Sequence, residues 1–107
     1  MGGKGAQEIE EFIIQVKKRY HPELILLFVS RTRDDHLKHS DYDIIIVSEE
    51  FEGIHFLERI YQLLEFWDYN FDVDILPYTP DEFNKKRNQI GIVNQAIKEG
   101  IVLQGSY

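Results

Sequence analysis

The chain has 107 residues, the length of one domain with a modest core, which is expected over residues 6–107 after a flexible leader of residues 1–5. Its formal net charge of −7 disfavours binding to a polynucleotide. The absence of cysteine excludes disulfides, thiolate catalysis and cysteine-ligated zinc. No apolar stretch has membrane-spanning length and none forms a signal peptide, so a cytoplasmic protein without membrane contacts is expected.

Hydrophobic periodicity predicts the first elements in chain order. Residues 6–20 form a helix, with acidic side chains early and basic ones late, which complements the helix dipole. His21-Pro22 ends that helix, and two strands follow over residues 24–29 and 41–47, separated by a polar connection. A second amphipathic helix is then predicted from apolar side chains at helical spacing, which are Phe51, Ile54, Leu57, Ile60, Tyr61 and Leu64.

The second half of the chain also alternates between predicted strands and helices. A third strand covers residues 69–76, and Thr79-Pro80-Asp81-Glu82 has the pattern of a capping box that begins a helix. A further helix ends at Gly100, and Ile101-Val102-Leu103 forms a short last strand. The order α-β-β-α-β-α-α-β predicts an α/β (α+β) fold, a mixed β-sheet with helices mainly on one face.

Two acidic residues open the second predicted strand. In Asp41-Tyr42-Asp43 the alternation of side chains along a strand places both carboxylates on one side and Tyr42 on the other. Two like charges held together favour a bound cation, because a charge within a strand is costly unless it is compensated. Taken alone, the pair fits equally well with the solubilising start of an ordinary strand.

Further polar residues strengthen the cation interpretation. The third predicted strand repeats the acidic and apolar alternation with Asp72 and Asp74, which share parity, so the pattern does not choose between them. Two strands can therefore supply three or four carboxylates, and Mg²⁺ prefers such oxygen ligands. Ser30, Arg31 and Arg33, which follow the first strand, would add a hydroxyl and two guanidiniums that suit phosphate.

These motifs together resemble the minimal nucleotidyltransferases of the DNA polymerase beta-type superfamily, particularly their short archaeal and bacterial members. Residues 27–33 (LFVSRTR) take the place of the family's apolar-Gly-Ser-Arg-x-Arg segment, and residues 40–47 (SDYDIIIV) match its Ser-Asp-x-Asp strand. Residues 73–76 (VDIL) match the strand of the third carboxylate. The likeness runs from about Leu24 to Leu103 and includes the segment at residues 78–83.

The resemblance implies a nucleotidyltransferase-like core and a transfer of a nucleoside monophosphate from an NTP, expected to be ATP, to a hydroxyl. Asp41 and Asp43 would hold Mg²⁺ or Mn²⁺ against the triphosphate, and Asp74 would share a second ion near the acceptor. The resemblance also assigns the phosphate contacts, with Ser30 on the β/γ-phosphates and Arg31 or Arg33 offsetting their charge.

A protein partner is implied by the same resemblance. Many minimal nucleotidyltransferases act as antitoxins beside an all-helical HEPN-domain toxin, and some transfer AMP to a toxin tyrosine. A helical partner of this type, or a homo-oligomer, is therefore expected to complete the site of so short a chain.

Two departures from the family pattern support an alternative function. Val29 stands where the family has the glycine before its serine, and Asp34 stands where a second glycine commonly closes the loop. Glycine allows close backbone approach to a triphosphate, which a β-branched valine resists. The alternative is a catalytically weakened or inactive binding module. A weaker third interpretation is a structural α/β protein whose acidic pair is incidental.

Overall fold

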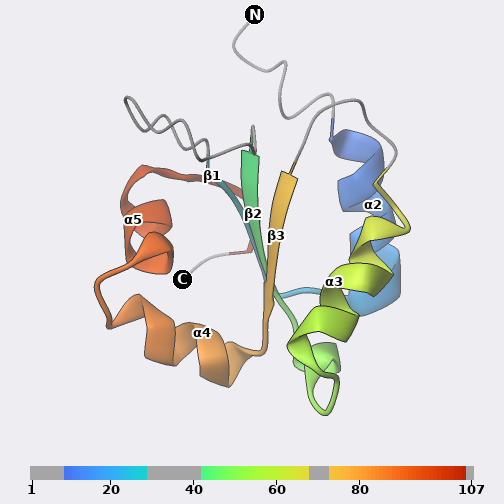
Figure 1. Cartoon of the computed structure of the whole chain (residues 1–107). Coiled ribbons are helices and arrows are strands. Elements are labelled where there is room, and N and C mark those ends of the chain that lie inside the picture. Colours follow the sequence, from blue (N-terminus) through green and yellow to red (C-terminus); the bar gives the residue numbers. More distant parts are fainter. Residues whose placement is uncertain (1–8, 29–41, 68–72, 106–107) are drawn as a thin grey trace, which may run out of the picture.

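The computed structural model describes residues 9–28, 42–67 and 73–105 (Figure 1). Its elements in chain order are α2 (Glu10–Tyr20), β1 (Leu24–Phe28), β2 (Tyr42–Val47), the 3₁₀ helix η1 (Glu49–Phe51), α3 (Phe56–Leu64), β3 (Val73–Tyr78), α4 (Pro80–Arg87), α5 (Ile92–Glu99) and β4 (Ile101–Gly105). The predicted order of helices and strands is confirmed, with η1 added to it. None of the helices in the described ranges has the length and apolarity needed to cross a bilayer.

The four strands form one mixed sheet in the order β3-β2-β1-β4. β1 pairs antiparallel with β2 and with β4, whereas β2 and β3 run parallel. The parallel pair requires a crossover connection, and α3 lies within it. As a result β2 and β3 begin at the same end of the sheet, which is also the end where β1 finishes.

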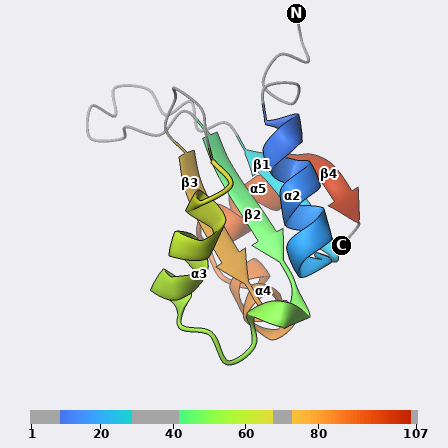
Figure 2. The ribbon, with the colours of Figure 1, turned by 90° about the vertical axis from the view of Figure 1, so that its right-hand side faces the viewer.

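Both faces of the sheet are covered, which confirms the mixed α/β class but corrects the expectation of helices mainly on one face. Figure 2 shows α2 and α3 in front of the sheet, with α4 and α5 behind it. The strand residues under α2 and α3 are Ile25, Leu27, Ile44, Ile46 and Ile75. The strand residues under α4 and α5 are Leu24, Leu26, Phe28, Ile45, Val47 and Tyr78. The continuous apolar runs of β1 and β2 are explained by burial on both faces.

The second amphipathic helix begins later than predicted and turns a different face to the core. Phe51 belongs to η1, and a turn follows in which Gly53 has a φ of +79°. α3 starts only after His55, whose ring accepts a hydrogen bond from the backbone N–H of Leu57. Arg59 and Leu63 are the buried residues of α3. Three of the predicted apolar positions are instead exposed, by 40% to 68% of their surface, and these are Leu57, Tyr61 and Leu64.

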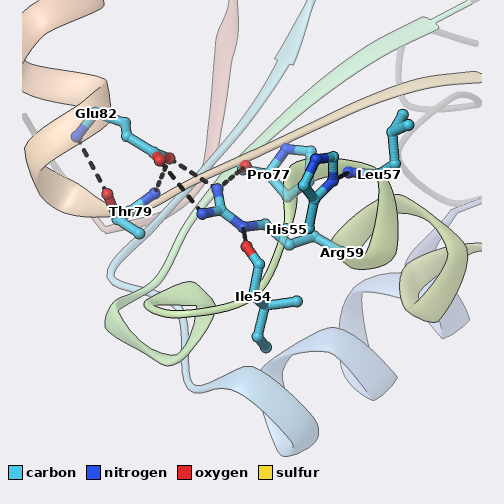
Figure 3. Close-up of polar contacts among 7 residues, drawn as sticks. All are labelled: Ile54, His55, Leu57, Arg59, Pro77, Thr79 and Glu82. Atoms are coloured by element: carbon cyan, nitrogen blue, oxygen red, sulfur yellow. Dashed lines mark hydrogen bonds and ion pairs between the residues drawn. The ribbon is translucent and has the colours of Figure 1, made fainter.

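A buried arginine joins α3 to β3 and α4 (Figure 3). The Nε atom of Arg59 donates to the Ile54 carbonyl at 2.7 Å, and its Nη1 donates to the Pro77 carbonyl at 3.0 Å. The two Nη atoms also donate to the two carboxylate oxygens of Glu82, at 2.7 and 3.2 Å. Every one of these contacts satisfies a donor that burial would otherwise leave costly. Pro77, on the edge strand β3, has no N–H to offer a further strand.

The predicted capping box at the start of α4 is confirmed and shares Glu82 with this arginine. The Thr79 hydroxyl accepts from the Glu82 N–H at 3.2 Å, and Glu82 Oε1 accepts from the Thr79 N–H at 2.9 Å. The hydrogen bond from Arg59 is the main cause that lowers the pKa of Glu82 below its ordinary value, against the effect of partial burial. Glu82 therefore fixes the start of α4 and its position on α3 together.

Gly105 at the end of β4 is expected to be intolerant of a side chain. Its φ is +81°, and a Cβ at this position would lie 1.8 Å from the Glu23 carbonyl oxygen. Gly53 has a similar φ of +79° but nothing within 4 Å of its Cβ position. We expect Gly53→Ala to lower the free energy of unfolding by about 1 kcal/mol from backbone strain alone, and Gly105→Ala to lower it further. Chemical denaturation of both variants measures the difference, and equal losses would contradict the close approach.

Candidate functional site

Asp43 and Asp74 lie side by side at the end of the sheet where β2 and β3 begin. They are direct partners in the parallel register of these strands. Adjacent strands are about 4.8 Å apart, and paired residues project to the same side. By alternation Asp43 shares its face with Ile45 and Val47, so both carboxylates are on the face covered by α4 and α5. The structure thus brings together two of the three predicted carboxylates.

The two carboxylates differ in exposure. Asp43 is 0% exposed, since β2 lies between β3 and β1, where Phe28 is its antiparallel partner. Asp74 is on the edge strand β3 and is exposed. A buried carboxylate is retained only where a cation, hydrogen bonds or a proton compensate its charge. The pair therefore combines one fixed, enclosed oxygen ligand with one that faces solvent, which fits a divalent cation reached from outside.

Tyr42, placed between the predicted ligands in sequence, projects to the opposite face. It packs against the core under α2 and α3, as the alternation predicts. Its neighbour Asp43 consequently projects to the other face, where Ile45 and Val47 also lie. This separation of an aromatic side chain from a carboxylate follows directly from the pleat of the strand.

The remaining predicted site residues lie outside the described ranges. Ser30, Arg31 and Arg33 follow β1 in sequence, and Asp41 immediately precedes β2. Val29, Asp34 and Asp72 are also outside them. Across residues 9–28, 42–67 and 73–105 no group of three or more His, Cys, Asp and Glu side chains is arranged to hold a metal ion. The predicted three-carboxylate set is therefore represented in the structure by Asp43 and Asp74.

The sequence analysis did not predict the role of Arg59. In the structure this residue holds α3, β3 and α4 together at the end of β3 opposite Asp74. The available signal was a single cation between apolar residues of a predicted amphipathic helix. A groove of about 490 Å³ was also not predicted. It lies between α2 and α3, on the face of the sheet away from both carboxylates, and its lining residues are Gln15, Lys18, Arg19, Tyr20, Gln62, Glu65 and Phe66.

Comparisons with known proteins identify the family and the fold. The family model described as "Polymerase beta, Nucleotidyltransferase" matches residues 10–106. No curated protein matches the chain. A crystal structure of a protein from Sulfolobus solfataricus assigned as a nucleotidyltransferase is 25% identical, with a TM-score of 0.57, and the match covers 90% of this chain and 76% of that one.

A second solved structure shares part of the layout. BolA1 from Arabidopsis thaliana is 25% identical with a TM-score of 0.51, and the match covers 68% of this chain and 92% of that one. The match covers less of this chain than the Sulfolobus structure does, and the family model spans nearly all of it. The chain belongs to the polymerase beta nucleotidyltransferase family.

Proposed function

We propose that the chain transfers a nucleoside monophosphate from an NTP, with ATP as the expected donor, to a hydroxyl acceptor in a reaction that depends on Mg²⁺ or Mn²⁺. The observation that carries the proposal is the in-register pair of Asp43 and Asp74 on one face of the sheet. Membership of the nucleotidyltransferase family supports the reaction class. The substrate, the metal and the acceptor are parts of the proposal.

Each residue has a separate role in it. Asp43, with Asp41, would hold a cation beside the triphosphate, and the more exposed Asp74 would hold one on the acceptor side. Ser30 and either Arg31 or Arg33 would bind the β/γ-phosphates through hydrogen bonds and opposite charge. When bound, the divalent cations offset the charge on the triphosphate and on the attacking and leaving oxygens.

The atoms balance in a single displacement. The acceptor oxygen forms a bond to the α-phosphorus, the bond from that phosphorus to the bridging oxygen breaks, and pyrophosphate leaves with the electron pair. The proton of the acceptor hydroxyl passes to solvent or to a carboxylate near it. The buried position of Asp43 fixes one ligand in advance, so little reorganisation is needed at this point.

The nature of the acceptor is a further part of the proposal. A hydroxyl of a protein, such as a tyrosine of a helical HEPN-type toxin partner, is preferred to a polynucleotide end, since the net charge of −7 disfavours a nucleic-acid backbone. Incubation with labelled ATP, Mg²⁺ or Mn²⁺ and the protein encoded beside this chain tests it. Label on the partner supports transfer to protein, and labelled polynucleotide would contradict this preference.

The second candidate function is a binding module of the same fold with little or no turnover. Val29 and Asp34, in place of the family's glycines, favour it.

If the chain is an enzyme, we expect Val29→Gly to tighten NTP binding and raise turnover, because glycine lets backbone N–H groups approach the phosphates. Calorimetry and a pyrophosphate-release assay measure both effects below the melting temperature. No turnover in either protein, with partner binding retained, would refute the enzyme and leave the binding module.

A further inference from the structure

The apolar face of α3 is not the face that α3 buries. Leu57, Tyr61 and Leu64 are 58%, 68% and 40% exposed, and Ile60 lies between them. At 3.6 residues per turn the centre of this set is roughly a third of a turn from the buried pair Arg59 and Leu63. The helix directs a charged residue into the protein and an apolar stripe toward solvent. We call Leu57, Ile60, Tyr61 and Leu64 the α3 stripe.

The orientation of α3 has a clear physical cause within the chain. Arg59 makes four hydrogen bonds to Ile54, Pro77 and Glu82, and its guanidinium also lies over the rings of Phe51 and Phe56 at 5.7 and 5.9 Å from their centroids. Rotating α3 to bury the α3 stripe would break these contacts and leave the Glu82 carboxylate without its cation. The exposed stripe is therefore a stable feature of the fold.

The spacing of the stripe is that of a helix packed on another helix. Leu57, Tyr61 and Leu64 follow one another at intervals of four and three residues, as the d, a and d positions of a heptad do. Glu58 and Glu65 then occupy the flanking e positions, and both are exposed. The surface is a short apolar seam with an acidic edge, on the side of the sheet away from Asp43 and Asp74.

Charge decides between a second copy of the chain and a different partner. In an antiparallel pair of identical helices the e positions of one face the e positions of the other. A two-fold dimer with antiparallel α3 helices would therefore set Glu58 of each copy against Glu65 of the other, within a protein whose net charge is already −7. Like charges so placed are destabilising. A helix with Lys or Arg at those positions reverses the sign of both contacts.

We propose that the α3 stripe is a docking surface for an amphipathic helix of another protein, one whose apolar seam is flanked by Lys or Arg opposite Glu58 and Glu65. The proposal rests on α3 alone and not on the nucleotidyl transfer. Removing metal or mutating Asp43 should leave this binding unchanged, so the two proposals fail separately.

Two short synthetic helices serve as probes. They carry the same leucine heptad seam and differ only in having Lys or Glu at the e positions. Fluorescence anisotropy should show the Lys peptide binding severalfold tighter than the Glu peptide, with the difference reduced by salt. The double variant Glu58→Lys/Glu65→Lys should reverse this preference. Equal binding of both peptides to the native chain would overturn the charge argument.

The apolar part is tested by the triple variant Leu57→Ser/Tyr61→Ser/Leu64→Ser. Binding of the Lys peptide should fall at least tenfold, while the melting temperature stays near that of the native chain because these side chains are not part of the core. Ile90→Ser, at a fully exposed isoleucine away from α3, is the matched control and should change neither the binding of the Lys peptide nor the melting temperature. A native dimer in sedimentation that the triple variant abolishes would assign the stripe to a second copy and overturn the proposal.

Discussion

Asp43→Asn is expected to reduce nucleotidyl transfer by about 10²–10³-fold, the loss typical when one electrostatic group of a reaction site is removed. The substitution keeps the size of the side chain but removes its charge, so affinity for Mg²⁺ or Mn²⁺ in the presence of NTP should also fall strongly. Calorimetry and a pyrophosphate-release assay on the same samples measure the two effects.

Asp74→Asn separates the two carboxylates by role. We expect a loss of turnover as large as that of Asp43→Asn but a smaller loss of NTP affinity, because Asp74 is assigned to the acceptor side. Asp81→Asn, an exposed aspartate in the first turn of α4, is the control and should leave both quantities unchanged. Unaltered turnover in Asp43→Asn would remove it from the site.

Glu82→Gln is expected to lower the free energy of unfolding by about 2 kcal/mol. Removing one partner of a buried ion pair costs more, about 3–5 kcal/mol, but the Glu82 side chain is 42% exposed and water weakens the pair. The amide can still accept from the Thr79 N–H, so the loss reports the charge opposite Arg59 and not the cap. Urea unfolding measures it, with Glu58→Gln on the exposed surface of α3 as a control that should stay within about 0.5 kcal/mol.

The same residue predicts how stability depends on pH. Arg59 holds the pKa of Glu82 below its ordinary value in the folded state. The unfolded state therefore binds a proton at higher pH than the folded state does, and the contribution of Glu82 is complete above the ordinary pKa. It is lost as the pH falls through the folded pKa, where both states are protonated. The native protein and Glu82→Gln should accordingly differ most near neutral pH and converge in acid, and a constant difference would contradict the ion pair.

The order of the elements could be predicted because its signals are local. The capping box at Thr79 and Glu82, the stop at His21-Pro22 and the apolar runs of β1 and β2 each involve residues close in sequence. The apolar runs of β1 and β2 also indicated a sheet covered on both faces, which the prediction of helices mainly on one face did not take into account. Strands without polar alternation, such as residues 24–28 and 44–47, are typical of sheets buried on both sides.

The face of α3 could not be predicted, because it depends on contacts that are distant in sequence. Arg59 is buried by the Pro77 carbonyl and the Glu82 carboxylate, 18 and 23 residues later. No periodicity within the helix indicates such a pairing. Hydrophobic spacing alone favours burial of Leu57, Tyr61 and Leu64, which the structure leaves exposed.

The candidate site was predictable in its residues but not in its register. The strand patterns place carboxylates near the starts of β2 and β3, yet a shift of one residue between these strands would put Asp43 and Asp74 on opposite faces. The parallel pairing of Asp43 with Asp74 follows from the α3 crossover and from the packing of Ile44 beside Ile75. The choice of Asp74 rested on the family resemblance, and Asp72 lies outside the described residues.

Paramagnetic broadening by Mn²⁺ tests the central claim most directly, because it reports where the cation binds. Mn²⁺ would be titrated into the isotope-labelled protein with a non-hydrolysable ATP analogue while the backbone amide signals are recorded. We predict selective loss of the signals at the starts of β2 and β3, around Asp43 and Asp74, with those of Val47 and Tyr78 at the far ends of the same strands retained, and with the loss abolished in Asp43→Asn. Broadening centred elsewhere, or none at any residue of β2 and β3, would contradict a cation site at this carboxylate pair.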